Sequence, residues 1–277
     1  MNGALPDTPS LQLLPRGGGV LEIRLNRVEA RNALSLAMVD ELRRALAWAE
    51  QQADLRALLL RGNGGHFCAG GDLKDMVRAR EAAAAQGPAA LERLNAAFGE
   101  LCLAFNDTPL ATVAVLEGSV MGGGFGLACV ADLVLAARSV CFQLPETQLG
   151  LVPAQIAPFL VQRLGYAQAR RLAVGAGRLD GEQALRLGLV HELHDAAALD
   201  AAVQAQLRQI ARCAPRALAA TKALMARAQQ VAARDLVPEA AAVFARAALG
   251  DEGREGLAAF AERRAPRWAT DLGEAGV

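Results

Sequence analysis

Lysine is scarce in this sequence, and the total positive charge does not exceed the negative. Lys74 and Lys222 are the only lysines among 277 residues, and 29 basic residues match 29 acidic ones, so the formal charge at pH 7 is zero. Proteins that hold nucleic acid through its phosphates carry clusters of excess positive charge. The sequence has no such cluster, and we expect no nucleic-acid partner.

Long apolar runs and a secretory leader are also absent. No stretch approaches the roughly 18 uninterrupted apolar residues that a membrane-spanning helix needs. The N-terminal sequence MNGALPDTPSLQLLPRGGGV has no basic start followed by an apolar run, which a secretory signal requires. We therefore expect no membrane partner and a cytoplasmic location.

Cysteines and aromatic residues are few. The five cysteines are odd in number and nowhere spaced as CxxC, which argues against a disulfide framework and a zinc site. We expect reduced, mostly buried thiols and no metal. Aromatic residues make up 4% of the sequence and hydrophobic residues 53%, so the core must consist mainly of aliphatic side chains and alanine.

The apolar patterns predict strands that alternate with helices, and then helices alone. A helix should begin after Ser35 and run to about Gln52, and the segment 78–90, rich in alanine and containing Gly87-Pro88, should be a mobile excursion. From about Ala197 the patterns are helical only. We predict an α/β domain over residues 1–196 and a helical region over 197–277. Strands are expected at Leu11–Leu14, Val20–Leu25, Arg56–Leu60, Ala111–Leu116, Asp132–Ala136 and Val140–Leu144.

Two segments are rich in glycine. The run VMGGGFGLACVAD (120–132) leads into an apolar stretch that is typical of a buried helix, and GNGGHFCAGGD (62–72) follows a predicted strand. Glycine inside a helix costs about 1 kcal/mol relative to alanine, so at Gly126 either the backbone must approach something closely or a side chain would be in the way. Unpaired N–H groups at a helix start can hold negative charge on a substrate oxygen. Either loop alone is explained by a flexible turn, but two that face one carbonyl would form an oxyanion hole.

Four further blocks stand out in the sequence: LNRVEARNALS (25–35), GHFCAGGDL (65–73), EGSVMGGGFGLACVADLVLA (117–136) and FQLPETQLGLVPAQIAPFLVQRLG (142–165). In order and spacing they resemble the signature of the crotonase (enoyl-CoA hydratase/isomerase) superfamily. The resemblance covers nearly the whole chain and implies an α/β fold, a crotonase-like ββα spiral core with a helical C-terminal trimerisation region. It implies an acyl-CoA substrate, of which coenzyme A is part, so no separate cofactor is expected. It also implies a homotrimer or a dimer of trimers.

The resemblance also implies the site residues. The N–H groups of Gly71 and Gly123 would form the oxyanion hole, and Glu146 would be the catalytic carboxylate. Phe260 and Arg263 match tail positions that can complete a coenzyme A site, often from a neighbouring subunit. The positions that would line the coenzyme A arm are Ala30, Arg31, Ala69, Asp72 and Leu73.

The sequence departs from the family pattern at Gly126. The family hydrates with two glutamates, which divide acid and base work, and the first of them falls on Gly126 here. Glu146 would then both orient the water and shuttle its proton, and the space over Gly126 would admit a bulkier substrate carbon. In this respect the sequence is similar to hydratases of 3-branched glutaconyl-CoA esters. Isohexenylglutaconyl-CoA, from the breakdown of acyclic terpenes, is the favoured substrate, and 3-methylglutaconyl-CoA is the next.

Other functions stay open. An enoyl-CoA isomerase would need the same oxyanion hole and a single carboxylate, and a decarboxylase of a malonyl-type thioester is a further alternative. RNA binding, which some relatives are thought to perform through a lysine-rich helix, is disfavoured because VDELRRALAWAEQQ (39–52) has mixed charge and no lysine.

Several polar residues are expected to have structural roles. His66, His191 and His194 should be structural or at the surface, since HELH lacks the HExxH spacing of a metalloprotease. Asp132 should be buried and hydrogen-bonded, and Lys74 should be solvated.

Overall fold

A six-stranded sheet with the order β1-β2-β3-β4-β6-β9 forms the centre of the computed structural model, which describes residues 4–269. β1 pairs antiparallel with β2, and the other neighbours pair in parallel. A second sheet has the order β5-β7-β8. The strands are β1 Leu11–Arg16, β2 Val20–Leu25, β3 Ala57–Gly62, β4 Ala111–Leu116, β5 Ser119–Met121, β6 Leu133–Ala137, β7 Cys141–Gln143, β8 Arg178–Asp180 and β9 Glu192–His194.

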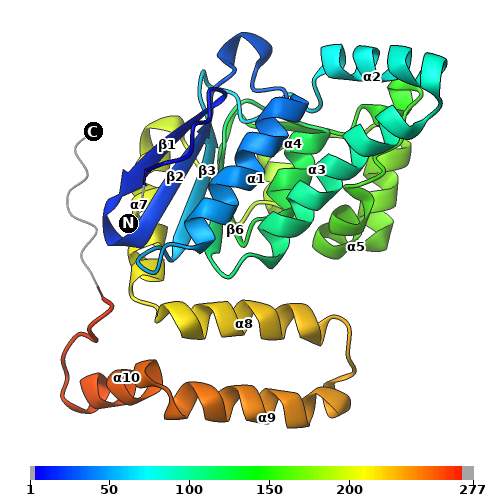
Figure 1. The fold of residues 1–277 in the computed structure, drawn as a ribbon. Coiled ribbons are helices and arrows are strands. Elements are labelled where there is room, and N and C mark those ends of the chain that lie inside the picture. Colours follow the sequence, from blue (N-terminus) through cyan, green and yellow to red (C-terminus); the bar gives the residue numbers. More distant parts are fainter. Residues whose placement is uncertain (1–3, 270–277) are drawn as a thin grey trace.

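Helices cover both faces of the main sheet (Figure 1). The first begins as predicted, because the Ser35 side chain accepts a hydrogen bond from the Met38 N–H at 3.2 Å and so caps it. Short 3-10 turns are η1 Gly17–Gly19, η2 Val28–Ala30 and η3 Glu146–Leu149. The α-helices are α1 Leu36–Glu50, α2 Leu73–Gln86, α3 Ala89–Asp107, α4 Gly123–Val130, α5 Ala157–Val174, α6 Gly181–Arg186, α7 Ala196–Ala211, α8 Pro215–Ala228, α9 Ala233–Leu249 and α10 Asp251–Ala261.

Two apolar clusters form the core, one on each face of the sheet. Alternate residues of a strand face opposite sides, so Leu58 of β3 joins one cluster and Leu59 the other. The larger cluster includes residues of α1, α3, α4 and α5, and the smaller one includes α7. This α/β architecture confirms the predicted fold class.

The predicted mobile excursion over 78–90 is wrong. α2 continues to Gln86 and α3 begins at Ala89, so only Gly87-Pro88 interrupts the helices. Gly87 has φ 87°, a left-handed conformation that ends the helix. α2 has no buried residue, so it lacks the apolar face by which a helix is recognised in sequence.

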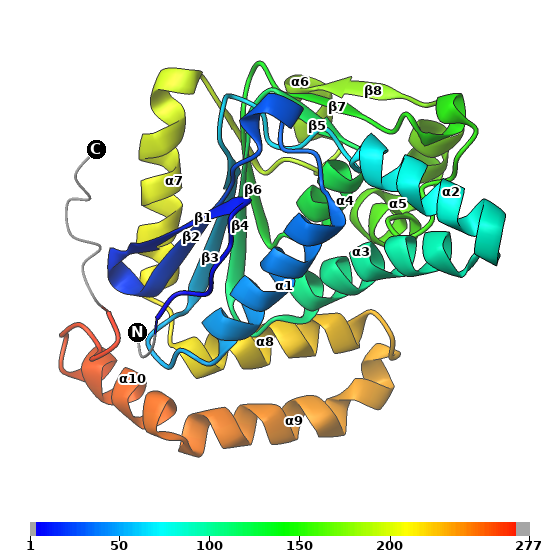
Figure 2. The ribbon, with the colours of Figure 1, turned by 45° about the horizontal axis from the view of Figure 1, so that its top comes forward.

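The C-terminal helices differ in how they pack. α7 packs on the sheet, whereas α8, α9 and α10 form an arm beside the body of the molecule (Figures 1 and 2). No residue of α8 or α9 is buried. The division into a domain over residues 1–196 and a helical region over 197–277 stays a prediction. The first three residues of that domain and residues 270–277 of the helical region lie outside the described residues.

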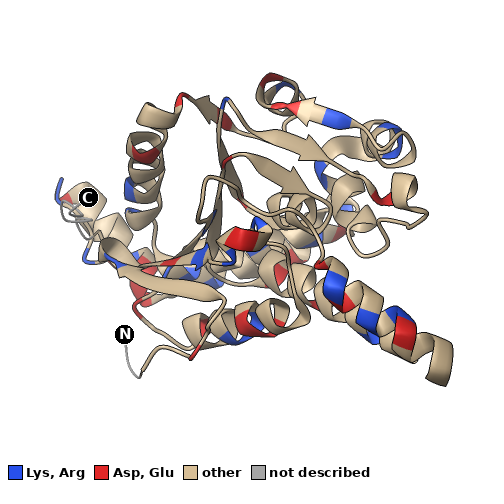
Figure 3. Cartoon of the chain, turned by 90° about the horizontal axis from the view of Figure 1, so that it is seen from above, with Lys and Arg blue, Asp and Glu red and all other residues tan. Residues whose placement is uncertain are grey.

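The surface carries both signs of charge close together. Seen from above, basic and acidic residues alternate along the helices (Figure 3). Between residues 4 and 269, no helix is both long enough and apolar enough to cross a membrane.

Candidate active site

The glycine loop before α2 pairs with two separate segments of the chain. On one side the Cys68 N–H donates to the Ser119 carbonyl at 3.0 Å, and the Met121 N–H donates to the Cys68 carbonyl at 2.9 Å. Cys68 and Val120 thus form an isolated parallel bridge. These bonds place the end of the first glycine loop beside the start of the second.

On its other side the loop pairs with Leu34, and this pairing orients Gly71. The Leu34 N–H donates to the Gly70 carbonyl at 2.8 Å, and the Asp72 N–H donates to the Leu34 carbonyl at 2.9 Å. The Gly71 N–H shares a trans peptide group with the Gly70 carbonyl, and the N–H and C=O of one such group point in opposite directions, so the Gly71 N–H points away from Leu34. Within residues 4–269, the Gly71 amide has no hydrogen-bond acceptor.

Gly123 is the first residue of α4, where helix geometry leaves an N–H without an acceptor. Gly122 precedes it with φ 48° and donates its own N–H to the Gln143 carbonyl at 3.1 Å. A Cβ on Gly122 would lie 3.7 Å from the Gly70 Cα, so the backbones of the two loops touch. That the Gly71 and Gly123 N–H groups converge on one oxygen stays a prediction.

Glu146 lies against this junction. It opens η3 after Pro145, and its Oε1 is 2.9 Å from the position of a Cβ on Gly122. Its Oε2 is buried and has no hydrogen-bond partner among the described residues. Burial raises the pKa of the Glu146 carboxyl, although its own backbone amide opposes the shift. A buried carboxylate oxygen without a partner is costly, and such groups are found where function requires them.

The expected open space over Gly126 is not present, because a neighbouring side chain fills it. A Cβ on Gly126 would stand 3.2 Å from the Ile156 Cβ and still closer to its Cγ2, and 3.5 Å from the Cζ of Phe98. Ile156 is 3% exposed. Gly126 therefore accommodates Ile156 rather than an empty cavity.

Asp72 is held in a structural network at the start of α2. Its side chain caps the helix by accepting the Lys74 N–H at 2.8 Å, and its Oδ2 is 2.7 Å from the Arg27 Nη2. Burial alone would raise the pKa of Asp72, but hydrogen bonds from Arg27 and the Lys74 amide keep it below its usual value. The carboxylate is thus turned toward Arg27 and the helix start.

The other predicted coenzyme A residues lie near the first glycine loop. The Ala69 N–H donates to the Arg31 carbonyl at 3.0 Å, which joins two of the sequence blocks. Ala30 ends η2, Arg31 has a left-handed φ of 47°, and Leu73 is 66% exposed. An exposed apolar side chain at a loop rim is available to a ligand.

Phe260 and Arg263 are not part of this cluster in a single chain. They lie at the end of α10 and just after it, in the arm outside the body of the molecule, whereas α4 lies inside the body and α2 lies at its far end (Figures 1 and 2). Phe260 is 86% exposed. A contribution of these two residues to the site would have to come from another copy of the chain.

The histidines have structural roles, as predicted. His66 Nδ1 accepts the Ser119 N–H at 3.1 Å, His191 Nδ1 accepts the Val134 N–H at 2.9 Å, and His194 pairs with Glu192. No group of three or more His, Cys, Asp or Glu side chains in the described part of the chain is placed to hold a metal ion.

The prediction for Asp132 is right in one part and wrong in another. The side chain accepts hydrogen bonds from the Thr112 N–H at 2.7 Å and from Lys222 Nζ at 2.7 Å, but it is 34% exposed rather than buried. It fastens α8 to the sheet at the surface.

Sequence reasoning missed Phe98 and Ile156. Both come next to glycines only through packing of α3, α4 and the segment before α5, which no local pattern reveals. The one available signal was Gly99, a second glycine inside a helix that is otherwise rich in alanine.

Comparisons with known proteins found similar sequences and similar structures. The profile of the enoyl-CoA hydratase/isomerase family matches residues 16–271. A solved structure titled Pseudomonas aeruginosa AtuE superposes with a TM-score of 0.90 at 53% identity, covering 94% of this chain and 100% of that one. An enoyl-CoA hydratase/isomerase from Marinobacter aquaeolei gives 0.90 at 46% identity, with 94% and 99% covered. The mouse mitochondrial enoyl-CoA hydratase domain-containing protein 2 is 35% identical, covering 94% of this chain and 89% of the relative.

Proposed function

Because the chain belongs to the enoyl-CoA hydratase/isomerase family, we propose that this enzyme adds water to the double bond of a 3-branched glutaconyl-CoA ester. The observation that carries the proposal is the position of Glu146. Its carboxylate is buried, has an oxygen without a partner in the described structure and lies against Gly122, next to the start of α4.

The proposed reaction uses one carboxylate and two backbone amides. Glu146 takes a proton from water as the water oxygen bonds to C3 of the enoyl group. The electrons of the double bond move toward the thioester oxygen, which the N–H groups of Gly71 and Gly123 hold. Such donors are typically each worth roughly 3 to 4 kcal/mol in the transition state. Glu146 then returns the proton to C2. One molecule of water is thus added across the double bond, and the Glu146 carboxylate is regenerated.

The absence of a carboxylate at position 126 supports a branched substrate. Ile156 and Phe98 pack over Gly126, so the surroundings of this position are apolar, and of the two side chains Phe98 is only partly buried. An alkyl branch on C3 fits such a surface, whereas a polar group would lose its hydration without a partner. Among such esters we favour isohexenylglutaconyl-CoA, an intermediate of acyclic terpene breakdown, with 3-methylglutaconyl-CoA as the alternative.

A panel of CoA esters in ¹⁸O-labelled water tests this proposal. The panel contains crotonyl-CoA, glutaconyl-CoA, 3-methylglutaconyl-CoA and isohexenylglutaconyl-CoA, and mass spectrometry follows the products. We expect ¹⁸O uptake, with the highest kcat/KM for a 3-branched glutaconyl ester. Movement of the double bond without ¹⁸O uptake would identify an isomerase, and a preference for crotonyl-CoA would reject the branched substrate.

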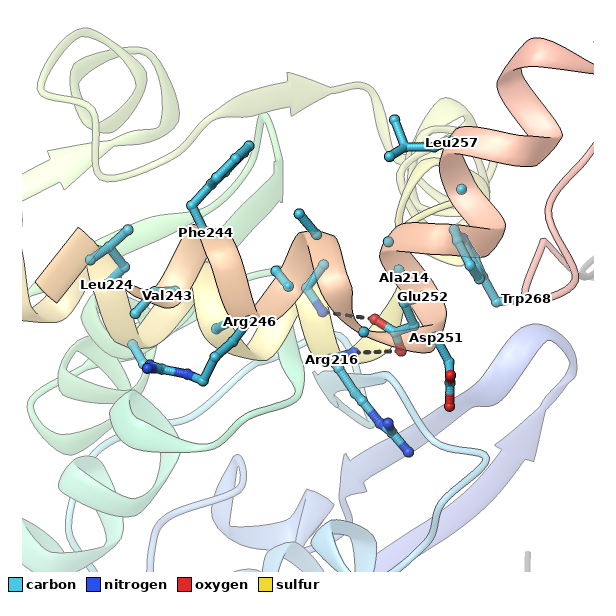
Figure 4. A pocket seen from close by; sticks show the side chains of 18 of the residues that line it. Ala214, Arg216, Leu224, Val243, Phe244, Arg246, Asp251, Glu252, Leu257 and Trp268 are labelled. Carbon is cyan, nitrogen blue, oxygen red and sulfur yellow. Dashed lines mark hydrogen bonds between the residues drawn. The ribbon is translucent and has the colours of Figure 1, made fainter. Parts of the chain in front are cut away.

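We also propose that the enzyme assembles as a trimer or a dimer of trimers in the cytoplasm. Between α8, α9 and α10 lies a hollow of about 640 Å³, lined by apolar side chains such as Val243, Phe244 and Leu257 (Figure 4). Phe244 is 75% exposed and Leu257 67%. Apolar surface of this kind is typical of a protein interface. Assembly would also bring Phe260 and Arg263 to the site of a neighbouring copy.

A further inference from the structure

Arg163 of α5 binds the C-terminal end of α4. Its Nε donates to the Cys129 carbonyl at 3.2 Å, and its Nη2 donates to the Ala128 carbonyl at 3.5 Å and to the Ala131 carbonyl. Its remaining nitrogen, Nη1, lies 3.3 Å from the His191 Nε2. Three carbonyls at one helix end therefore share a single cation.

These carbonyls need a donor from outside the helix. The last four carbonyls of an α-helix have no partner within it, and a carbonyl that is away from water and has no partner is costly. Ala128 is fully buried, and Cys129 and Ala131 are each 8% exposed. Arg163 thus supplies hydrogen bonds that water is poorly placed to supply.

The positive charge of Arg163 faces the carbonyl end of α4. Burial lowers the pKa of Arg163, and the neighbouring Cys129 and Asp132 oppose this shift. The Asp132 Oδ2 is itself bound by the Lys222 Nζ at 2.7 Å. A cation at the C-terminus of a helix interacts favourably with the helix dipole. The end of α4 therefore helps to balance the charge of Arg163.

α4 depends on outside support because it is a weak helix on its own. It has eight residues, three of which are Gly123, Gly124 and Gly126. Glycine is the least favourable helix residue after proline, and isolated helices shorter than about 12 residues are marginal in water. The N-cap residue, Gly122, provides no side-chain hydrogen bond. Contacts with the rest of the chain must therefore hold α4 in place, and α5 packs against it (Figure 2).

We propose that Arg163 is a positioning residue for the hydration, which holds the last carbonyls of α4 and so keeps the Gly123 N–H directed at the thioester oxygen. The inference rests on the proposed function and on the proposed role of this amide. A helix of eight residues is about 12 Å long, so Arg163 acts through the helix. It offsets the negative end of the helix dipole, and the positive end at Gly123 stays available to the charge that develops on the oxygen.

Arg163→Met and Arg163→Lys test this role, and Arg170→Met, at an exposed position of the same helix, is the control. Methionine has neither donors nor charge, whereas lysine keeps the charge and can donate to a carbonyl. With 3-methylglutaconyl-CoA we expect the kcat of Arg163→Met to fall by about tenfold or more, since misplacing a catalytic group by about 1 Å can cost 10²-fold. KM should stay near the wild-type value, lysine should restore part of the kcat, and the control should match the wild type.

The carbonyl band of a bound ester separates positioning from stability. Butyryl-CoA labelled with ¹³C at the thioester carbonyl has no double bond to hydrate, and infrared difference spectra report how strongly its carbonyl is polarised. A hydrogen bond lowers the carbonyl frequency, so the band should lie below that of the free ester in the wild type. It should move back toward the free ester in Arg163→Met. An unchanged kcat in this variant, or a lower kcat with an unchanged band, would overturn the proposal.

Arg163→Gln replaces Arg163→Met if the methionine variant does not fold by circular dichroism, and an unchanged kcat or carbonyl band there would overturn the proposal as well. The wild type keeps the two proposals apart. If it takes up ¹⁸O and the Arg163 variants match it in kcat and band, only the role of Arg163 is wrong. A wild type that hydrates none of the esters in the panel rejects the proposed function and this role together.

Discussion

The Glu146 Oε1 lies 2.9 Å from where a Cβ on Gly122 would stand, so the carboxylate can approach the start of α4 only because residue 122 has no side chain. Gly122 also has a backbone φ of 48°, which residues other than glycine rarely adopt. The glycine thus serves both the turn into the helix and the approach of the carboxylate.

Glu146→Gln should separate binding from chemistry. The variant keeps the shape of the side chain and both glycine loops, so the Kd of a CoA ester should stay near the wild-type value. Turnover should fall by roughly 10²- to 10⁴-fold, as expected for loss of a general acid-base group. Isothermal titration with a saturated acyl-CoA and a steady-state assay measure the two quantities. Turnover within a factor of ten of wild type would remove Glu146 from the mechanism.

The same variant should show a pH-dependent gain in stability. Burial raises the pKa of Glu146, so the ionised carboxylate is less favourable in the folded chain than in the unfolded one. Its contribution to stability is present below the unfolded value of about 4.3 and is lost as the pH rises through the higher folded value. Glutamine stays neutral throughout. We expect the Tm of Glu146→Gln to exceed that of wild type at pH 7.5, and the difference to shrink near pH 4; a difference that does not vary with pH would contradict this.

Gly71→Ala and Gly71→Pro test the first oxyanion amide. A Cβ on Gly71 would meet nothing nearer than the Met76 Sδ at 3.8 Å, so alanine fits and keeps the N–H. Proline removes the N–H. We expect turnover to fall by roughly 10²- to 10³-fold in the proline variant relative to the alanine variant. Thermal melts of both variants control for folding, and equal turnover in two folded variants would reject the role of this amide.

Assembly should depend on the apolar faces of α9 and α10. Phe244→Glu and Leu257→Glu place charges on exposed apolar positions, which costs little in a lone chain and much in a buried interface. Light scattering should give a trimer or hexamer for wild type and smaller species for the double variant. Val174→Glu, an equally exposed change on α5, is the control. A wild-type monomer at micromolar concentration would contradict the proposal.

The strands of the core could be predicted closely, and the packing around α4 could not. Val20–Leu25 and Ala111–Leu116 were predicted with the bounds that the structure has, because both strands are apolar runs between turn signals. α2 was missed because it buries no residue and so shows no apolar face. β5, β8 and β9 have three residues each and were not predicted as separate strands, since so short a run carries no period.

The candidate site could be predicted where it depends on residues close in sequence. Gly71, Gly123 and Glu146 lie in recognisable blocks, and the backbone pairing brings those blocks together. The reason why residue 126 is a glycine could not be predicted. The space of its side chain is occupied by Ile156, which is thirty positions further along the chain. A missing side chain shows that something approaches, but only the tertiary structure shows what it is.

Gly126→Glu alone should destabilise the fold, because the new Cβ would collide with Ile156, a β-branched side chain that cannot easily move. Ile156→Ala in the same chain removes that obstacle, so the double variant should melt higher than Gly126→Glu alone. The double variant would also carry a second carboxylate near Glu146. The like charges would repel each other, and they would weaken the binding of a substrate that has a carboxylate of its own. We expect kcat/KM for 3-methylglutaconyl-CoA to fall sharply and that for crotonyl-CoA to fall less or to rise. Thermal melts and the two assays on wild type, both single variants and the double variant give the coupling between the positions. If the change in Tm of the double variant equals the sum of the changes in the two single variants, Ile156 does not occupy the space of a side chain at position 126.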